Sequence, residues 1–144
     1  KLIYIISDKL DGISCLYFKK NDKSYIFKKN NTEVKEITKY IPYINFGFDL
    51  NTLPNNICVR GELIIPKSKW VTMNGYKVQR NAVNGLLSCE SKKFKIKEYD
   101  QFIDFVAYSI YDYESQHNLE NDYKKLKNYG FKDTKIWLKY QFKG

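Results

Sequence analysis

The sequence predicts an α+β domain built mainly from antiparallel sheets with short helices. Apolar runs rich in β-branched and aromatic residues outnumber the segments with helical spacing. Turn residues such as Asn21-Asp22 separate neighbouring runs and indicate hairpins, whose strands are antiparallel. The chain has 144 residues, of which 43% are hydrophobic and 17% aromatic, enough to bury one core. We therefore expect one domain, or part of one.

The expected strands are short, and the strongest lies near the middle of the chain's second half. They cover residues 2–6, 13–18, 24–28, 57–65, 102–111 and 136–142. The second and third form a hairpin across Asn21-Asp22. In the fourth strand, Cys58, Leu63 and Ile65 are expected to face the core.

The expected helices are short as well. They cover residues 33–43 (a helix or turn), 66–73, 81–87 and 115–129. Thr32 and Asn81 are candidate N-caps for the first and third of these segments. Pro66 would open the second helix, and Gly130 would end the fourth. Residues 51–56 form a polar loop around a proline.

Composition excludes several classes of protein. The net charge of +9 attracts polyanions, but a lysine-rich proteome explains it equally well, so charge alone does not establish nucleic-acid binding. Three widely spaced cysteines and a single histidine argue against a structural zinc site and against a disulfide framework. No apolar run is long enough to span a membrane, and no signal peptide is visible. We expect an intracellular protein with reduced thiols and no membrane partner.

The segment Lys9-Leu10-Asp11-Gly12 lies between two expected strands and carries reactive groups. In extended chain, Lys9 and Asp11 point to the same side, and Gly12 permits close backbone approach. A lysine that attacks phosphorus must be neutral, so we expect burial or nearby cations to remove its proton. The alternative is a β-turn with a surface lysine and aspartate.

Three further segments offer ligand-binding groups. In Arg60-Gly61-Glu62-Leu63 the carboxylate can accept hydrogen bonds from a sugar hydroxyl, or form a cross-strand ion pair. Residues 79–85 place Arg80 at the start of a helix, where it could contact a ligand. The alternative is an ordinary helix N-terminus with polar residues. Residues 105–108 belong to a core strand, and the open question is whether one aromatic ring, such as that of Tyr108, faces a ligand.

In order and spacing, these segments resemble the adenylation domain of NAD-dependent DNA ligases over nearly the whole chain. The matching parts are residues 9–12, 60–63, 66–67, 80–85, 105–109 and 130–131. Short motifs are individually weak, but motifs that match in the same order seldom do so by accident.

The resemblance implies a nucleotidyltransferase fold and a DNA ligase activity. Lys9 would take AMP from NAD, pass it to the 5′-phosphate of nicked double-stranded DNA, and allow the nick to be sealed with Mg²⁺ as cofactor. Asp11 would support the chemistry, Glu62 would hold the ribose, Tyr108 would stack on adenine, and Arg80 would contact phosphate. The cofactor-binding set that the resemblance implies is completed by Ser7, Leu10, Gly12 and Lys28.

The chain departs from the family pattern at several positions. Ser7 stands where the family has glutamate, Lys28 where it has an arginine, and Ser88 where it has a second arginine. The family's nicotinamide-recognising segment would precede Lys1, and its two later lysine motifs would follow Gly144. We therefore expect the N-terminal and central part of an adenylation domain, inactive without the remaining domains of the same polypeptide.

Other readings of the same residues stay open. One is an ATP-dependent DNA or RNA ligase, with ATP in place of NAD, or a capping guanylyltransferase. Another is a non-catalytic nucleic-acid-binding relic of such a domain.

Overall fold

The computed structural model describes residues 3–6, 9–29, 31–73, 78–88, 96–111, 119–133 and 138–141. Its strands are β1 (Ile3–Ile6), β2 (Ile13–Lys20), β3 (Lys23–Lys29), β4 (Val34–Glu36), β5 (Ile44–Asn45), β6 (Ile57–Ile64), β7 (Ile103–Tyr111), β8 (Lys132–Asp133) and β9 (Leu138–Gln141). Its α-helices are α1 (Lys67–Trp70), α2 (Gln79–Leu86) and α3 (Leu119–Tyr129). Three 3₁₀ helices are η1 (Thr38–Tyr43), η2 (Leu50–Thr52) and η3 (Ile96–Tyr99). The α+β class expected from the sequence is confirmed.

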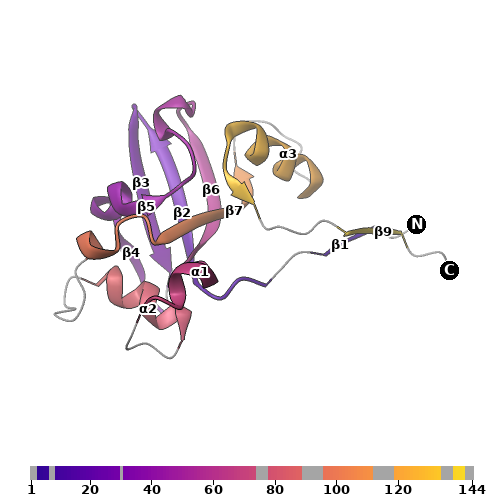
Figure 1. The fold of residues 1–144 in the computed structure, drawn as a ribbon. Coiled ribbons are helices and arrows are strands. Elements are labelled where there is room, and N and C mark those ends of the chain that lie inside the picture. Colours follow the sequence, from indigo (N-terminus) through magenta and orange to yellow (C-terminus); the bar gives the residue numbers. More distant parts are fainter. Residues whose placement is uncertain are drawn as a thin grey trace.

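One sheet of seven strands forms the body of the molecule (Figure 1). Its order is β4-β3-β2-β6-β7-β5, and β8 also pairs with β7. The central pairs are antiparallel, whereas β5 and β8 run parallel to β7. Helices α1 and α2 lie together at one end of this sheet, and α3 lies beside β7 (Figure 1).

The hairpin between β2 and β3 follows the sequence expectation. Asn21 and Asp22 have positive φ angles of 51° and 60°, as a two-residue hairpin turn requires. The turn sets a register in which Cys15 pairs with Lys28 and Lys20 with Lys23. This register later decides which side chains of β3 reach the pocket.

The core lies on one face of β2 and β6. Tyr17, Val59 and Leu63 are fully buried there, and Phe105 of β7 packs edge-on against Tyr17. Leu63 is buried as expected, and so is Ile65 just beyond the strand. Cys58 is only half-buried and belongs to the other face, because residues an odd number apart in a strand point to opposite sides.

Two local expectations about capping were wrong. Residues 33–43 form β4 followed by η1, and η1 starts after Ile37, so Thr32 caps nothing. Val34 and its neighbours instead pair with β3 as an edge strand. Helix α2 starts two residues earlier than expected, with Val78 as its N-cap, and Asn81 already donates its backbone N–H to the Val78 carbonyl.

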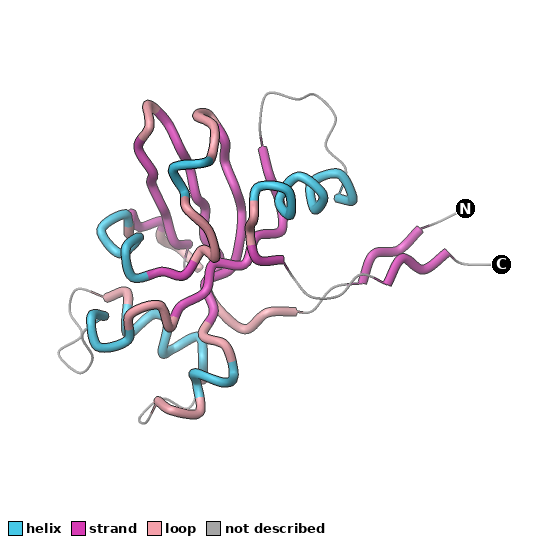
Figure 2. The backbone as a smooth tube through the Cα atoms, turned by 45° about the horizontal axis from the view of Figure 1, so that its top comes forward, coloured by secondary structure: helices cyan, strands magenta, loops and turns pink. Residues whose placement is uncertain are grey.

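The strands β1 and β9 form a separate two-stranded antiparallel ribbon, in which Ile3 pairs with Gln141. Figures 1 and 2 both show this ribbon projecting away from the seven-stranded sheet. Both strands were expected from the sequence. Within the described residues, no helix is long and apolar enough to cross a membrane.

Candidate active site

A pocket of about 360 Å³ opens at the end of the sheet where β2 begins. Its lining comes from β2, the end of β3 and the residues after it, β6, and α2. The lining residues are Gly12, Ile13, Ser14, Lys29, Asn31, Glu62, Arg80 and Asn84. The volume lies in the range of small-molecule sites. A second pocket, around Phe46 and Phe48, contains none of the site residues expected from the sequence.

Glu62 of β6 lines the pocket beside β2. It pairs in register with Ser14, so the two side chains lie next to each other on neighbouring strands. Burial raises the pKa of the Glu62 carboxyl above its usual value, and the charge of Asp11 adds to this. The cations Arg80 and Arg60 and the backbone N–H of Gly12 act in the opposite direction. A carboxylate perturbed by burial inside a cleft is a typical feature of a binding or catalytic site.

Gly12 is required by the close approach of β2 to β6. A Cβ atom at this position would lie 2.1 Å from the carbonyl oxygen of Leu63 and 2.8 Å from the Cγ2 atom of Ile64. No side chain fits at these distances. Close backbone approach, expected from the sequence, is therefore confirmed, and it lets Gly12 donate its N–H to Glu62.

Helix α2 presents a polar side to the pocket and an apolar side to the core. Arg80 and Asn84 are four residues apart, so they lie on one side of the helix, and both line the pocket. Ala82, Val83 and Leu86 are buried in the core. The Arg80 guanidinium lies 3.6 Å from an Asp11 carboxylate oxygen. This ion pair ties α2 to the segment that carries Lys9.

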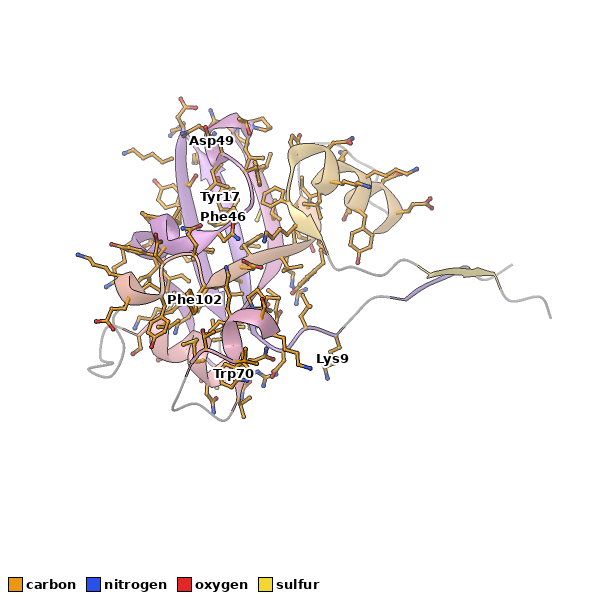
Figure 3. The ribbon with its side chains drawn as sticks, in the orientation of Figure 1. Lys9, Tyr17, Phe46, Asp49, Trp70 and Phe102 are labelled. Carbon is orange, nitrogen blue, oxygen red and sulfur yellow. The ribbon has the colours of Figure 1, made fainter. Side chains whose placement is uncertain are left out.

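Lys9 is exposed and does not line the pocket. Figure 3 shows it on the segment that leaves the sheet towards β1. Within the described residues it makes no hydrogen bond and no ion pair, so the burial expected for this amine is not seen in this form of the chain. It stands only two residues before Asp11, a separation of about 7 Å in extended chain. Leu10 is half-buried, and Ser7 lies outside the described residues.

Two more of the expected cofactor-binding residues lie outside the lining. Lys28 is 5% exposed, and its Nζ atom donates to Asn84 Oδ1 at 3.3 Å. Tyr108 packs against the core, and the Arg60 guanidinium lies over its ring, 5.6 Å from the centroid. The strand pairing of β6 with β7 shifts between Arg60 and Gly61, which leaves Tyr108 between the paired positions.

Sequence reasoning missed part of the lining. Ser14, Lys29, Asn31 and Asn84 line the pocket but were not assigned a role. The four-residue spacing from Arg80 could have identified Asn84, and the pairing of β2 with β6 could have identified Ser14. In the described part of the chain, no group of three or more His, Cys, Asp or Glu side chains could hold a metal ion.

The fold and the pocket together define an α+β domain that offers cations, amides and one perturbed carboxylate to a polar ligand, next to a lysine-bearing strand connection. No family model matches the chain. It is 31% identical over 132 residues to the DNA ligase of Acanthamoeba polyphaga mimivirus, a match covering 90% of this chain and 20% of that protein. It is 28% identical over 124 residues to the "Putative DNA ligase 205R" of Invertebrate iridescent virus 6, covering 85% of this chain and 19% of that protein. The chain thus spans about one fifth of the length of these curated relatives.

Proposed function

We propose that this chain is the lysine-bearing part of the nucleotidyltransferase (adenylation) domain of a DNA ligase, and that Lys9 becomes covalently linked to AMP. The observation that carries this proposal is the meeting of Asp11, Gly12, Glu62 and Arg80 around one pocket. These residues come from three segments separated by as many as 69 positions in the sequence. The similarity to proteins named DNA ligase supports the same reaction.

In the proposed first step, the neutral Lys9 amine attacks the α-phosphorus of a nucleotide. A P–N bond forms while the P–O bond to the leaving half breaks, so NAD releases nicotinamide mononucleotide, or ATP releases pyrophosphate. The ammonium form loses one proton before the attack and the amine loses a second as the P–N bond forms, and both protons pass to solvent. Arg80 and Lys29 would balance the negative charge on the phosphate, and Glu62 would accept a hydrogen bond from a ribose hydroxyl.

In the later steps, AMP passes from Lys9 to the 5′-phosphate at a DNA nick, and the 3′-hydroxyl then displaces AMP to seal the strand. Magnesium fits this scheme, because Mg²⁺ is held by one or two carboxylates together with substrate phosphates. Asp11, which pairs with Arg80 beside the pocket, is the carboxylate that would hold it. When bound, the ion would neutralise charge on the transferred phosphate.

The exposure of Lys9 sets a requirement for the proposed chemistry. Attack on phosphorus needs a neutral amine, so Lys9 must be enclosed by the nucleotide or by other parts of the protein when it reacts. We therefore expect adenylation in the full-length protein and not in residues 1–144 alone. Because the side chain is exposed, Lys9→Ala should leave the fold intact.

The test is label transfer in the full-length protein. The protein is incubated with Mg²⁺ and either NAD, ATP or GTP that carries label in the nucleoside monophosphate, and labelled peptides are sequenced. We expect label from NAD on Lys9, none in Lys9→Ala, and a normal level in the matched control Lys20→Ala on an exposed part of β2. Label from ATP alone would refute NAD use, and label from GTP alone would indicate a guanylyltransferase. Label on another residue would refute the role of Lys9.

A second candidate is a non-catalytic nucleic-acid-binding module. The exposed Lys9 and the net charge of +9 favour it. Under this alternative the full-length wild type forms no adduct with any nucleotide, while binding to nicked DNA persists unchanged in Lys9→Ala. Adduct formation in the wild type excludes it.

A further inference from the structure

The Lys28–Asn84 pair fixes which atoms of Asn84 a ligand can meet. The Lys28 ammonium has only donors, so the Asn84 amide must turn its oxygen towards Lys28, as the 3.3 Å contact shows. The amide nitrogen is then left as the remaining polar group of a side chain that lines the pocket. No other described residue is hydrogen-bonded to this side chain. Asn84 therefore has both amide N–H donors available to a ligand, while its oxygen is already engaged by Lys28.

The neighbours of Asn84 indicate the chemistry of the group it would meet. Arg80 stands one turn earlier on the same side of α2, and Lys29 and Asn31 line the pocket as well. Side chains of this kind favour an anionic oxygen, because hydrogen bonds to charged acceptors are stronger than those to neutral ones. Glu62, the one carboxylate among the described residues that line the pocket, suits a hydroxyl group and would repel an anion.

We propose that Asn84 is a recognition residue that donates a hydrogen bond to a phosphate oxygen, and that Lys28 is a positioning residue that acts through Asn84. The proposal rests on the function proposed above for the class of ligand. The phosphate belongs either to the bound nucleotide or to the 5′ end of a DNA nick. Lys28 is buried, so its contribution to phosphate recognition passes through the amide that it orients.

The test measures how much a phosphate adds to binding by the full-length protein. Calorimetry compares AMP with adenosine, and nicked duplexes with a 5′-phosphate or a 5′-hydroxyl. Asn84→Asp keeps the size of the side chain and the contact with Lys28, but replaces the donor with a carboxylate. The phosphate preference is the ratio of the two affinities within a pair, and we expect Asn84→Asp to lower it at least about tenfold in one pair. The pair that is affected shows whether the phosphate belongs to the nucleotide or to the nick.

Asn81→Asp is the matched control. It adds the same charge to the same helix at an exposed residue outside the pocket, so the preference should stay at the wild-type level. A preference that is unchanged in Asn84→Asp for both ligand pairs overturns the proposal. So does equal weakening of AMP and adenosine, which would place the contact at the base or the ribose.

The role of Lys28 is tested in combination with Asn84. Lys28→Met should lower the phosphate preference in the wild-type background and lower it no further in Asn84→Asp, because a positioning residue acts on the phosphate through the Asn84 amide. Lys28→Arg, which keeps the charge and the donor, should show a phosphate preference close to that of the wild type. Additive losses would refute positioning through Asn84.

These outcomes separate this proposal from the ligase proposal. If Asn84→Asp loses the phosphate preference but wild-type protein forms no adduct on Lys9, phosphate recognition stands and the ligase proposal falls. If the adduct forms and Asn84→Asp keeps the preference, the ligase proposal stands and the assignment of Asn84 falls.

Discussion

Replacing Arg80 with glutamine should change the chemistry of the pocket while leaving the fold nearly as stable. The side chains of the Arg80–Asp11 pair are 58% and 46% exposed, and the two atoms are 3.6 Å apart. Exposed ion pairs contribute about 1 kcal/mol or less to stability. The thermal midpoint of Arg80→Gln should therefore fall by no more than about 4 °C, which differential scanning fluorimetry can measure.

The expected effect of Arg80→Gln on the pKa of Glu62 has a definite direction. Burial raises the pKa of Glu62, and Arg80 is the strongest of the groups that oppose this rise. Without Arg80 the pKa rises further. The ionised carboxylate accepts a stronger hydrogen bond from a hydroxyl than the protonated group does, so the acid limb of adduct formation should move to higher pH in Arg80→Gln.

The assay is the pH dependence of the initial rate of Lys9 labelling in the full-length protein at saturating nucleotide. Arg60→Gln is the comparison, because Arg60 lowers the pKa of Glu62 less than Arg80 does and should move the limb less. An acid limb that stays in place in Arg80→Gln, or moves to lower pH, would refute the electrostatic coupling of Arg80 to Glu62. A large loss of thermal stability in Arg80→Gln would contradict the small contribution assigned to the Arg80–Asp11 ion pair.

Three further predictions concern stability. Gly12→Ala should destabilise the fold by about 3 kcal/mol or more, seen as a lower urea midpoint, because its Cβ would overlap the Leu63 carbonyl; an unchanged midpoint would contradict the close approach of β2 to β6. Lys19→Met should cost about 2–4 kcal/mol, since the buried Nζ atom of Lys19 donates to three backbone carbonyls, whereas the exposed Lys20→Met serves as a control with almost no effect. Glu62→Gln should raise the melting temperature at neutral pH, because a carboxyl group whose pKa is raised by folding destabilises the fold at any pH where it is ionised. The gain should vanish as the pH falls below 4.5, the ordinary pKa of the group, where the carboxyl is protonated in both the folded and the unfolded chain. A gain that persists in acid would contradict this cause.

The sheet could be predicted from the sequence because its strands carry their own signals. Alternation of buried and half-buried residues in β2 and β6 follows the period of a strand, and Asn21-Asp22 marks the hairpin turn. Residues 33–43 misled the prediction because β4 consists of three exposed residues, and an edge strand of that length has no apolar alternation. Its strand form comes from pairing with β3, which is a tertiary contact.

The candidate site could be predicted only in part, for a related reason. Motif order identified Asp11, Gly12, Glu62 and Arg80, and the structure brings them together. Lys29 lines the pocket and Lys28 is buried because they lie on opposite faces of β3. The register of β3 with β2 decides which face each of them occupies. A shift of one residue would exchange their places. The two-residue turn fixes this register, but apolar residues occupy both faces of β3: Ile26 is buried, whereas Tyr25 and Phe27 are half-buried. The sequence of β3 therefore does not show which face meets the core.

The ion pair between Asp11 and Arg80 has a consequence for how a ligand would enter the pocket. Arg80 is held by a carboxylate on the segment of Lys9, and this half-exposed pair is weak. A phosphate that binds beside Asn84 can therefore replace Asp11 as the partner of Arg80 at little energetic cost. Asp11 would then be released, two residues from Lys9, at the moment when the phosphate arrives. The proposed reaction needs a free carboxylate for Mg²⁺ at that same moment, so the weakness of the ion pair in this form of the chain favours the proposed function.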